Sequence, residues 1–486
     1  MTPLETFKAS LSRADVHDHI RSGLIGEDVK IDGPFGPKPL VYADYVASGR
    51  ALTQVEDFIR DQVLPYYANT HTQASFCGEY MTKLREAARA EIARLTNAGV
   101  GTSVVFTGAG STAGINRIAG LLDLAPLVAA GERVVVLTGP YEHHSNILPW
   151  RETGAEVIEI AEAVGGGVDL SDLDRALRDA QGAARIVGTF SAASNVTGLR
   201  TDTDAVTRLL KAHGALAVWD YGCAGPYCEM DMRPGTDAEK DAIVCSIHKF
   251  PGGPGASGVA VIRDAIATRA VPTLPGGGTV SFVSPWGHVY SDRLAAREEG
   301  GTPNVIGDIR AALAMLVKEA LGQHWLTARQ TELRERALAV WSRNDRIELL
   351  GQRGADALPI FSFRLTDGTG APVHHQFFTR LLSDLTGVQA RGGCACAGPY
   401  GHRLLGLDKT DSDATIAALE RGEETAKPGW VRLNLSALMS DEKVDFVIRA
   451  VDDLARRASD YADRYQVDPQ TARFKARTEA ATPLAS

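Results

Sequence analysis

The chain has 486 residues, of which 44% are hydrophobic and 23% charged, with a formal net charge of −9. This length exceeds what one compact core usually holds, so at least two domains are expected. The negative charge excludes the broad basic surface of nucleic-acid-binding proteins. No apolar run is long enough to cross a membrane, and the N-terminus lacks the form of a signal peptide, so we expect a cytoplasmic protein.

The first residues, 1–40, contain a short helical pattern and a connector rich in glycine and proline, and we expect them to pack with a smaller C-terminal domain. A large domain is predicted over residues 41–304. It opens with a short strand at 41–44, helices at 54–64 and 80–95, and a polar loop that contains His71.

Strand and helix patterns alternate between residues 100 and 270, which predicts an α/β fold with a mostly parallel sheet covered by helices on both faces. The predicted strands are residues 103–106, 133–137, 156–160, 185–190, 215–220, 241–245 and 258–262.

A smaller α+β domain is predicted over residues 305–466, because helical patterns there are interrupted by strand patterns at only 358–363 and 429–435. Between them, residues 408–427 form a charged segment that could cover a site or meet a partner. Residues 467–486 are polar and predict a loosely held tail.

Two predicted strands end in groups that can react. Asp220 ends one, and Lys249 follows the next, beside His248 and before a glycine-rich turn. Parallel strands place their C-terminal ends side by side, so we expect Asp220 and Lys249 to meet. Pyridoxal phosphate requires this pair, a lysine on its aldehyde and an acid on its ring nitrogen. The alternatives are a surface lysine and an acid that caps a helix or turn.

Small and hydroxyl-bearing residues open the helix predicted after residue 109. Ser111 and Thr112, with the free N–H groups of that helix, are suited to an anion such as phosphate, although an ordinary helix cap has the same pattern. Ser246 and His248, next to Lys249, are expected to face the same anion.

His143 lies in a loop after a predicted strand, where it could stack on a flat cofactor and move protons, or be an ordinary loop histidine. The spacing does not indicate a zinc site. Arg432, inside a strand pattern, must bind an anion or extend to solvent, and a substrate carboxylate is one such anion.

Two of the six cysteines, Cys394 and Cys396, lie in a loop of glycine and alanine. The six do not have the spacing of a small disulfide framework. A thiol on a small-residue loop is placed to react, although a metal half-site with His402 or two inert thiols are alternatives. A disulfide between cysteines one residue apart would be strained.

Four motifs in this order resemble the class V branch of fold-type I pyridoxal phosphate enzymes, over roughly residues 40 to 460, and most closely its SufS-like cysteine desulfurases and selenocysteine lyases. They are residues 142–150 (EHHSNILPW), 194–198 (SNVTG), 246–249 (SIHK) and 300–304 (GGTPN).

The resemblance implies a fold-type I transferase that converts L-cysteine to L-alanine and leaves a persulfide on Cys396. It also implies a homodimer with shared active sites and a sulfur-acceptor protein as partner, with no nucleic acid or membrane partner and no metal. Catalysis is then assigned to Lys249, Cys396 and His143, and substrate binding to Asn195, Arg432 and His71. Cofactor binding is assigned to Ser111, Thr112, His143, Asn195, Asp220, Cys223, Ser246, His248, Lys249 and, from the other subunit, Thr279.

The chain departs from the family pattern in three places, one of which is the stretch between Pro399 and Arg432, longer than usual and containing the charged segment 408–427. Cys223 stands where a glutamine usually contacts the ring hydroxyl of the cofactor, and Cys394-Ala395 replaces a pair of histidines before the reactive cysteine. These departures keep a second hypothesis open, another class V enzyme such as an aminotransferase, an epimerase or a C–S β-lyase. A non-enzymatic binding or sulfur-carrier scaffold that has lost catalysis is a third. The joint retention of four residues argues against it: Lys249, Asp220, His143 and Arg432.

Overall fold

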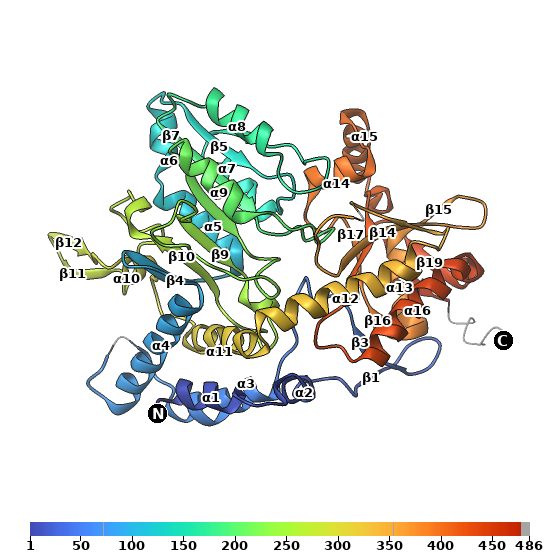
Figure 1. Ribbon diagram of the computed structural model, residues 1–486, viewed down its shortest axis with the longest axis horizontal. Helices are drawn as coiled ribbons and strands as arrows, with labels where there is room; N and C mark the ends of the chain where they lie inside the picture. Colours follow the sequence, from blue (N-terminus) through green and yellow to red (C-terminus); the bar gives the residue numbers. More distant parts are fainter. Residues whose placement is uncertain (71, 353, 478–486) are drawn as a thin grey trace. The chain divides into compact units, whose positions relative to one another are not determined.

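The computed structural model describes residues 1–70, 72–352 and 354–477. The chain divides into two compact units, coloured along the sequence in Figure 1. The large unit comprises residues 1–25, 48–194 and 200–325, and the small unit residues 26–47, 195–199 and 326–486. We describe each by itself.

A seven-stranded sheet in the order β4-β10-β9-β8-β7-β5-β6 forms the centre of the large unit. The strands from β9 to β6 in this order are parallel, and β10 is antiparallel to both its neighbours. The mostly parallel sheet is therefore confirmed. The strands are β4 (Thr102–Gly108), β5 (Val134–Thr138), β6 (Glu156–Glu159), β7 (Arg185–Ser191), β8 (Leu216–Asp220), β9 (Ala242–Cys245) and β10 (Gly258–Arg263).

Helices cover both faces of this sheet (Figure 1). On one face, Ile115 and Ile118 of α5 (Gly110–Leu121) and Trp150 of α7 (Leu148–Arg151) share a buried cluster with Val218 of β8. The next side chain along β8, Trp219, points to the opposite face, because side chains alternate along a strand. There its indole N–H donates to Thr207 of α9 (Thr203–Ala212), at 2.9 Å.

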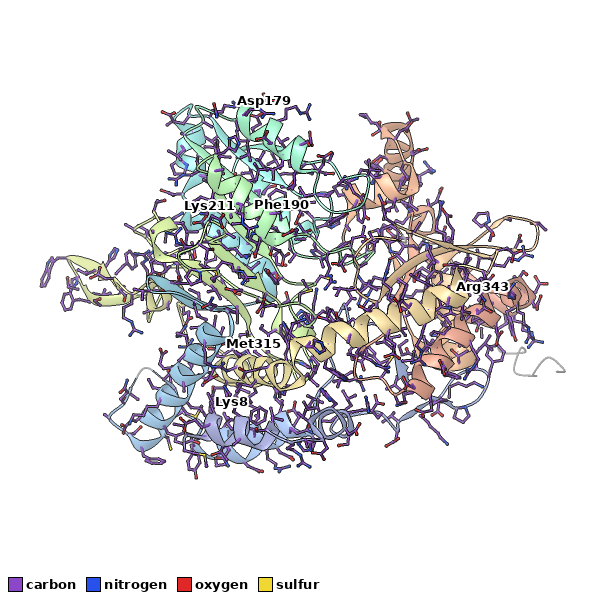
Figure 2. All side chains as sticks on the ribbon, in the orientation of Figure 1. Lys8, Asp179, Phe190, Lys211, Met315 and Arg343 are labelled. Atoms are coloured by element: carbon purple, nitrogen blue, oxygen red, sulfur yellow. The ribbon has the colours of Figure 1, made fainter. Side chains whose placement is uncertain are left out.

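Figure 2 labels two residues of this second face, Phe190 of β7 and Lys211 of α9. Phe190 is fully buried, with its ring centroid 5.8 Å from that of Trp219. Lys211 pairs with the buried carboxylate of Asp241, just before β9. This ion pair connects α9 to the sheet at the start of β9.

Helices α4 (Phe76–Leu95) and α11 (Val305–Leu321) pack together in the large unit, and α1 (Pro3–Leu11) packs on both. A hairpin of β11 (Val280–Ser284) and β12 (Gly287–Tyr290) carries exposed apolar side chains, with Trp286 at its turn 93% exposed. The other α-helices of this unit are α2 (Val16–Ser22), α3 (Thr53–Phe58), α6 (Leu124–Ala129), α8 (Leu170–Asp179) and α10 (Leu294–Glu298).

The small unit contains an antiparallel sheet in the order β13-β14-β18-β17, with β15 paired to β14. Its core joins this sheet to α12, α13 and α16 through buried residues such as Trp341, Phe378 and Val447. The elements are α12 (Gln323–Trp341), β13 (Ile347–Leu349), β14 (Ile360–Thr366), β15 (Pro372–Val373), α13 (His375–Thr386), β17 (Arg391–Gly393), β18 (Trp430–Asn434) and α16 (Asp441–Arg457).

An early segment of the chain belongs to this small unit. Residues 41–42 form β3 (Val41–Tyr42), which pairs in parallel with β16 (Val388–Gln389), and the amide of Val46 donates to the side chain of Asn434 at 3.1 Å. The same segment contains β1 (Lys30–Ile31) and β2 (Lys38–Pro39). Pairing with β16 thus brings Asp44 into the small unit.

The end of the described chain differs from the loose tail predicted from residue 467. Residues 465–476 form a hairpin of β19 (Tyr465–Asp468) and β20 (Arg473–Ala476). Tyr465 is buried and donates to Asp384 at 2.9 Å, and the Phe474 ring lies 5.4 Å from that of Phe377. Two aromatic side chains therefore anchor a segment that is otherwise polar, while residues 478–486 lie outside the described residues.

The charged segment at 408–427 forms α15 (Lys409–Glu420) and a short 3-10 turn, after α14 (Gly398–Leu405). Asp408 caps α15, accepting from the amide of Asp411 at 3.0 Å.

None of the described helices combines the length and the apolar character needed to cross a membrane.

Candidate active site

Asp220 and Lys249 follow adjacent parallel strands, as the sequence predicts. Asp220 ends β8, where it pairs with Val244 of β9, and Lys249 lies in the 3-10 turn that follows β9. Burial raises the pKa of Asp220, while the N–H of Gly222, Ser111 and the charge of Lys249 act to lower it. The structure therefore brings an amine and a buried carboxyl group into one electrostatic environment.

The turn that carries Lys249 packs closely against the backbone at Gly49 and Gly253. The amide of Gly49 donates to the His248 carbonyl at 2.9 Å. A Cβ on Gly49 would lie 2.0 Å from the carbonyl oxygen of Phe250, and one on Gly253 would lie 2.1 Å from that of Ile247. Larger residues cannot occupy these positions without shifting the turn, so the glycines position Lys249.

Hydroxyl groups line the N-terminus of α5. The amide of Ser111 donates to Ser246 Oγ at 2.8 Å, and the two serine oxygens lie 3.1 Å apart. Gly110 has a φ of 62°, and a Cβ there would lie 2.6 Å from Ser246 Oγ. No side chain caps this helix at Ala109, so its N–H groups and hydroxyls form a small cradle suited to an anion.

His143 joins this cradle through a chain of polar contacts. Its Nδ1 accepts from the amide of Ser145 at 3.1 Å, and Ser145 Oγ lies 2.6 Å from Thr112 Oγ1. An Nδ1 that accepts leaves the proton on Nε2 in the neutral ring. His248, on the Lys249 turn, has a pKa lowered by burial and by the charge of Lys249.

Glu142 is a buried group to which the sequence analysis assigned no role. It accepts from the amide of Ser191 at 2.7 Å, from the hydroxyl of Ser191 at 2.7 Å, and from Asn146. Burial nonetheless raises its pKa to about 7, and the nearby Asp220 carboxylate adds to this. Its position directly before His143 and His144, shortly after the strand that ends at Thr138, is the signal that could have identified it.

The remaining predicted cofactor residues of the large unit are each engaged. Cys223 is buried, and its thiol donates to the Ser194 carbonyl at 3.5 Å. Thr279 is fully buried, and its hydroxyl donates to Gly276 O at 2.6 Å within its own turn. His71, which the resemblance assigns to substrate binding, lies outside the described residues.

Arg432 of the small unit is buried and bound by an acid that the sequence analysis did not single out. Its Nη2 donates to Asp44 Oδ1 at 3.0 Å and its Nη1 to the Asn195 carbonyl at 3.1 Å. Arg391 donates to the other Asp44 oxygen at 2.9 Å. Among the residues that the structure describes, Arg432 Nε and Asn195 Oδ1 are buried polar atoms without a hydrogen-bond partner.

Cys394 and Cys396 are exposed in the loop between β17 and α14. The backbone is left-handed at Ala395 and Cys396, with φ of 52° and 55°. The side chain of Asn195 donates to the Ala395 carbonyl at 2.7 Å. The loop is thus tied to the residue that the resemblance assigns to the substrate.

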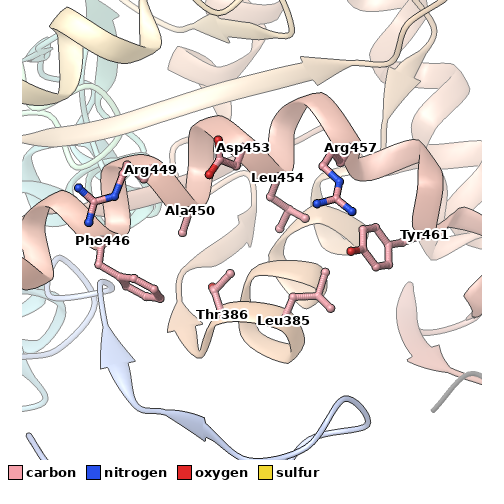
Figure 3. A pocket seen from close by; sticks show the side chains of 9 residues that line it. All are labelled: Leu385, Thr386, Phe446, Arg449, Ala450, Asp453, Leu454, Arg457 and Tyr461. Carbon is pink, nitrogen blue, oxygen red and sulfur yellow. The ribbon is translucent and has the colours of Figure 1, made fainter. Parts of the chain in front are cut away.

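A pocket of ≈ 320 Å³ lies elsewhere in the small unit, between the end of α13 and α16 (Figure 3). Leu385 and Leu454 contribute apolar lining, and Arg449, Asp453 and Arg457 are its charged residues. None of the predicted site residues lines it, so we do not assign it to the active site.

Residues 41–446 match the family model for aminotransferase class V, and the chain belongs to this family. The family and the fold together define an α/β enzyme of the pyridoxal phosphate-dependent type.

Its relatives within the family include proteins named probable cysteine desulfurase. One from Vibrio cholerae is 31% identical over 74% of this chain and 85% of its own length. Another, from Halalkalibacterium halodurans, is 27% identical over 81% and 96%.

Solved structures support the fold. The apo structure of a cysteine desulfurase from Thermococcus onnurineus matches with a TM-score of 0.73 at 23% identity, covering 90% of this chain and 98% of its own. A cysteine desulfurase from Escherichia coli matches with a TM-score of 0.69 at 21% identity, covering 91% and 98%.

Proposed function

We propose that this chain is a pyridoxal phosphate-dependent cysteine desulfurase that converts L-cysteine to L-alanine and leaves a persulfide on Cys396. The observation that carries the proposal is the loop of Cys396. Its thiol is exposed, and its neighbour Ala395 is bound by Asn195, whose carbonyl is in turn bound by Arg432. This arrangement connects a nucleophile to the residues proposed to bind the substrate.

The residues present fit pyridoxal phosphate. The N-terminus of α5 with Ser111, Thr112 and Ser246 offers amide and hydroxyl donors to a phosphate. A Cβ on Gly222 would lie 2.7 Å from Ser111 Oγ and 2.8 Å from Asp220 Oδ1, so only glycine keeps this space open. When bound, the cofactor supplies an electron sink for bond breaking next to the substrate amine.

The protein groups would then have separate tasks. Lys249 would hold the cofactor covalently and, once displaced by the substrate, move a proton at the α-carbon. Asp220 would hold the protonated ring nitrogen, and His143 would cover the ring and pass protons through Nε2. Cys223 offers the thiol that would stand at the ring hydroxyl, although it donates to Ser194 here.

Arg432 and Asn195 would bind the substrate carboxylate. Arg432 is already oriented by Asp44, so little side-chain entropy remains to be lost on binding. Its unused Nε supplies a donor. The Asn195 amide group has two N–H donors, of which one donates to the Ala395 carbonyl, and the other would donate to the carboxylate.

The Cys396 thiolate would attack the substrate sulfur. A sulfur–sulfur bond forms, the carbon–sulfur bond breaks, and its electron pair stays with the carbon, which takes up a proton to complete alanine. An exposed thiol on a loop of small residues suits this step, because the persulfide must afterwards reach an acceptor.

We also infer a homodimer with shared sites and a sulfur-acceptor protein as partner. The β11–β12 hairpin directly follows Thr279, and Phe282, Val283 and Trp286 are all more than half exposed. Contiguous exposed apolar side chains of this kind favour a protein contact. If the hairpin is the contact, the double variant Phe282→Ser, Trp286→Ser sediments as a monomer while the wild type sediments as a dimer.

The function is tested by alanine release from L-cysteine with a dithiol reductant present. Wild type and Cys77→Ser, a control thiol at the start of α4, should both produce alanine and sulfide. Cys396→Ser should lose both products while retaining pyridoxal phosphate. Alanine production by Cys396→Ser at the wild-type rate would reject Cys396 as the sulfur acceptor.

The alternative is an aminotransferase, epimerase or C–S β-lyase of the same family. Cys223, which would stand at the ring hydroxyl in place of the usual glutamine and whose thiol donates to the Ser194 carbonyl, keeps it open. Turnover of other small amino acids that survives Cys396→Ser would favour it.

A further inference from the structure

The second cysteine of the loop, Cys394, has no task in the reaction above. We propose that Cys394 is a resolving thiol, which attacks the persulfide on Cys396, releases hydrosulfide and leaves a Cys394–Cys396 disulfide. This inference rests on the proposed function, since it takes the persulfide as its starting point.

The backbone at Ala395 is the structural basis for this pairing. With a φ of 52°, Ala395 has the left-handed helical conformation. Helical geometry of either hand separates Cα atoms two residues apart by about 5.4 Å, whereas an extended strand separates them by about 6.6 Å. The Cα separations of disulfides centre on about 5.5–6 Å. The turn therefore removes much of the separation that makes such a disulfide strained.

Two hydrogen bonds hold the loop in this shape. The amide of Ala397 donates to the Cys394 carbonyl at 3.2 Å, which closes a turn around Ala395 and Cys396. Asn195 binds the carbonyl of Ala395, the residue between the two cysteines, at 2.7 Å. Left-handed backbone is costly for alanine and for cysteine, so these contacts maintain a conformation that local preference disfavours.

Both thiols are exposed, so a persulfide on Cys396 is open to solvent, and Cys394 is separated from it by one residue. The other four cysteines, Cys77, Cys223, Cys228 and Cys245, all belong to the large unit. Cys394 is the neighbour that shares the loop, and its attack is intramolecular.

The step is balanced without an oxidant. The Cys394 thiolate attacks Sγ of Cys396, the bond between that sulfur and the terminal sulfur breaks, and hydrosulfide leaves with the electron pair. A dithiol reductant then returns both cysteines to thiols. Exposed or strained disulfides are the ones that such reductants open readily. Sulfur that no acceptor protein takes up is thereby released as hydrosulfide. The loop then keeps the Cys394–Cys396 disulfide until a reductant opens it.

The test is a single turnover of the holoenzyme with one equivalent of L-cysteine and no reductant. Wild type should form one alanine and release one sulfide per chain. Cys394→Ser should form the same alanine but release no sulfide. Cys77→Ser should behave as the wild type, because its thiol lies in the large unit.

The products can be located in one tryptic peptide, because cleavage after Arg391 and Arg403 yields residues 392–403 with both cysteines. In the wild type this peptide should be lighter by two hydrogen atoms. In Cys394→Ser it should be heavier by one sulfur atom on Cys396.

Three results would overturn the proposal. A persulfide that persists equally in wild type and Cys394→Ser shows that Cys394 does not resolve it. A persulfide found on Cys394 shows transfer of the terminal sulfur in place of disulfide formation. Absence of alanine from the wild type removes the proposed function, and this inference with it.

Oxidation by diamide gives a readout that does not depend on turnover. The wild-type peptide 392–403 should lose both free thiols without forming a cross-link between chains. Two thiols in this peptide that stay reduced would contradict the geometry argued for Ala395.

Discussion

Asp44 and Arg432 lie 388 positions apart in the sequence, and their side chains form a buried ion pair with an Oδ1–Nη2 distance of 3.0 Å. The pair forms because β3 adds residues 41–42 alongside β16 and places the chain next to β18. The Arg432 guanidinium group, which is proposed to bind the substrate carboxylate, is therefore already paired with the Asp44 carboxylate of the same unit.

Asp44→Asn should destabilise the protein by about 3 kcal/mol, because removing one partner leaves the buried Arg432 charge uncompensated. Arg391→Gln is the matched control, since Arg391 binds the same carboxylate but its side chain is 50% exposed. Its loss should cost less than about 1 kcal/mol. Urea unfolding measures both, and equal losses would show that burial of the pair does not matter.

Lys249→Ala should abolish covalent retention of pyridoxal phosphate, because Lys249 is the amine proposed to bind the cofactor and its charge acts on Asp220. Borohydride reduction followed by intact mass measurement checks this. Lys211→Ala, on α9 and paired with Asp241, should retain the cofactor like the wild type. Cofactor still covalently attached in Lys249→Ala would place the reactive amine elsewhere.

Glu142 should make stability fall as pH rises from about 4.5 to about 7. Burial raises its pKa from 4.5 to about 7, so over this range the folded state binds more protons than the unfolded state, and raising the pH favours unfolding. Glu142→Gln imitates the protonated form and should remove this part of the pH dependence. Urea unfolding at several pH values measures the difference, and identical slopes would show that Glu142 is ionised throughout.

Lys318 should change the pH dependence of folding stability in the opposite direction, at higher pH. It is half-buried on α11, where it donates to the carbonyl of Gly225 at 2.7 Å and to that of Cys228, and desolvation lowers its pKa from 10.5 to about 8. Between these values the unfolded state binds more protons, so stability should rise with pH.

Lys318→Met should remove that rise and loosen the loop that carries Cys223. Lys8→Met is the control, since Lys8, labelled in Figure 2, is 46% exposed and pairs with Glu319 at the surface. Thermal unfolding between pH 8 and 10.5 measures the effect. A rise that persists in Lys318→Met would assign it to another group.

Much of the large unit could be predicted from the sequence. Seven apolar, β-branched runs became the seven strands of the sheet, because side-chain periodicity reports burial locally. The placement of Asp220 and Lys249 after the same edge of two adjacent strands followed from the rule that parallel strands share an edge. The family followed from motifs whose residues lie next to each other in the sequence.

Other features were decided only by the tertiary structure. The Asp44–Arg432 pair, the two donors from Ser191 to Glu142 and the anchoring of residues 465–476 by Tyr465 and Phe474 join residues far apart in the sequence. Such contacts have no local signal, because they depend on which surfaces the fold brings together. The left-handed backbone at Ala395 is the clearest case, since alanine alone favours other conformations and Asn195 from a distant loop helps to hold this one.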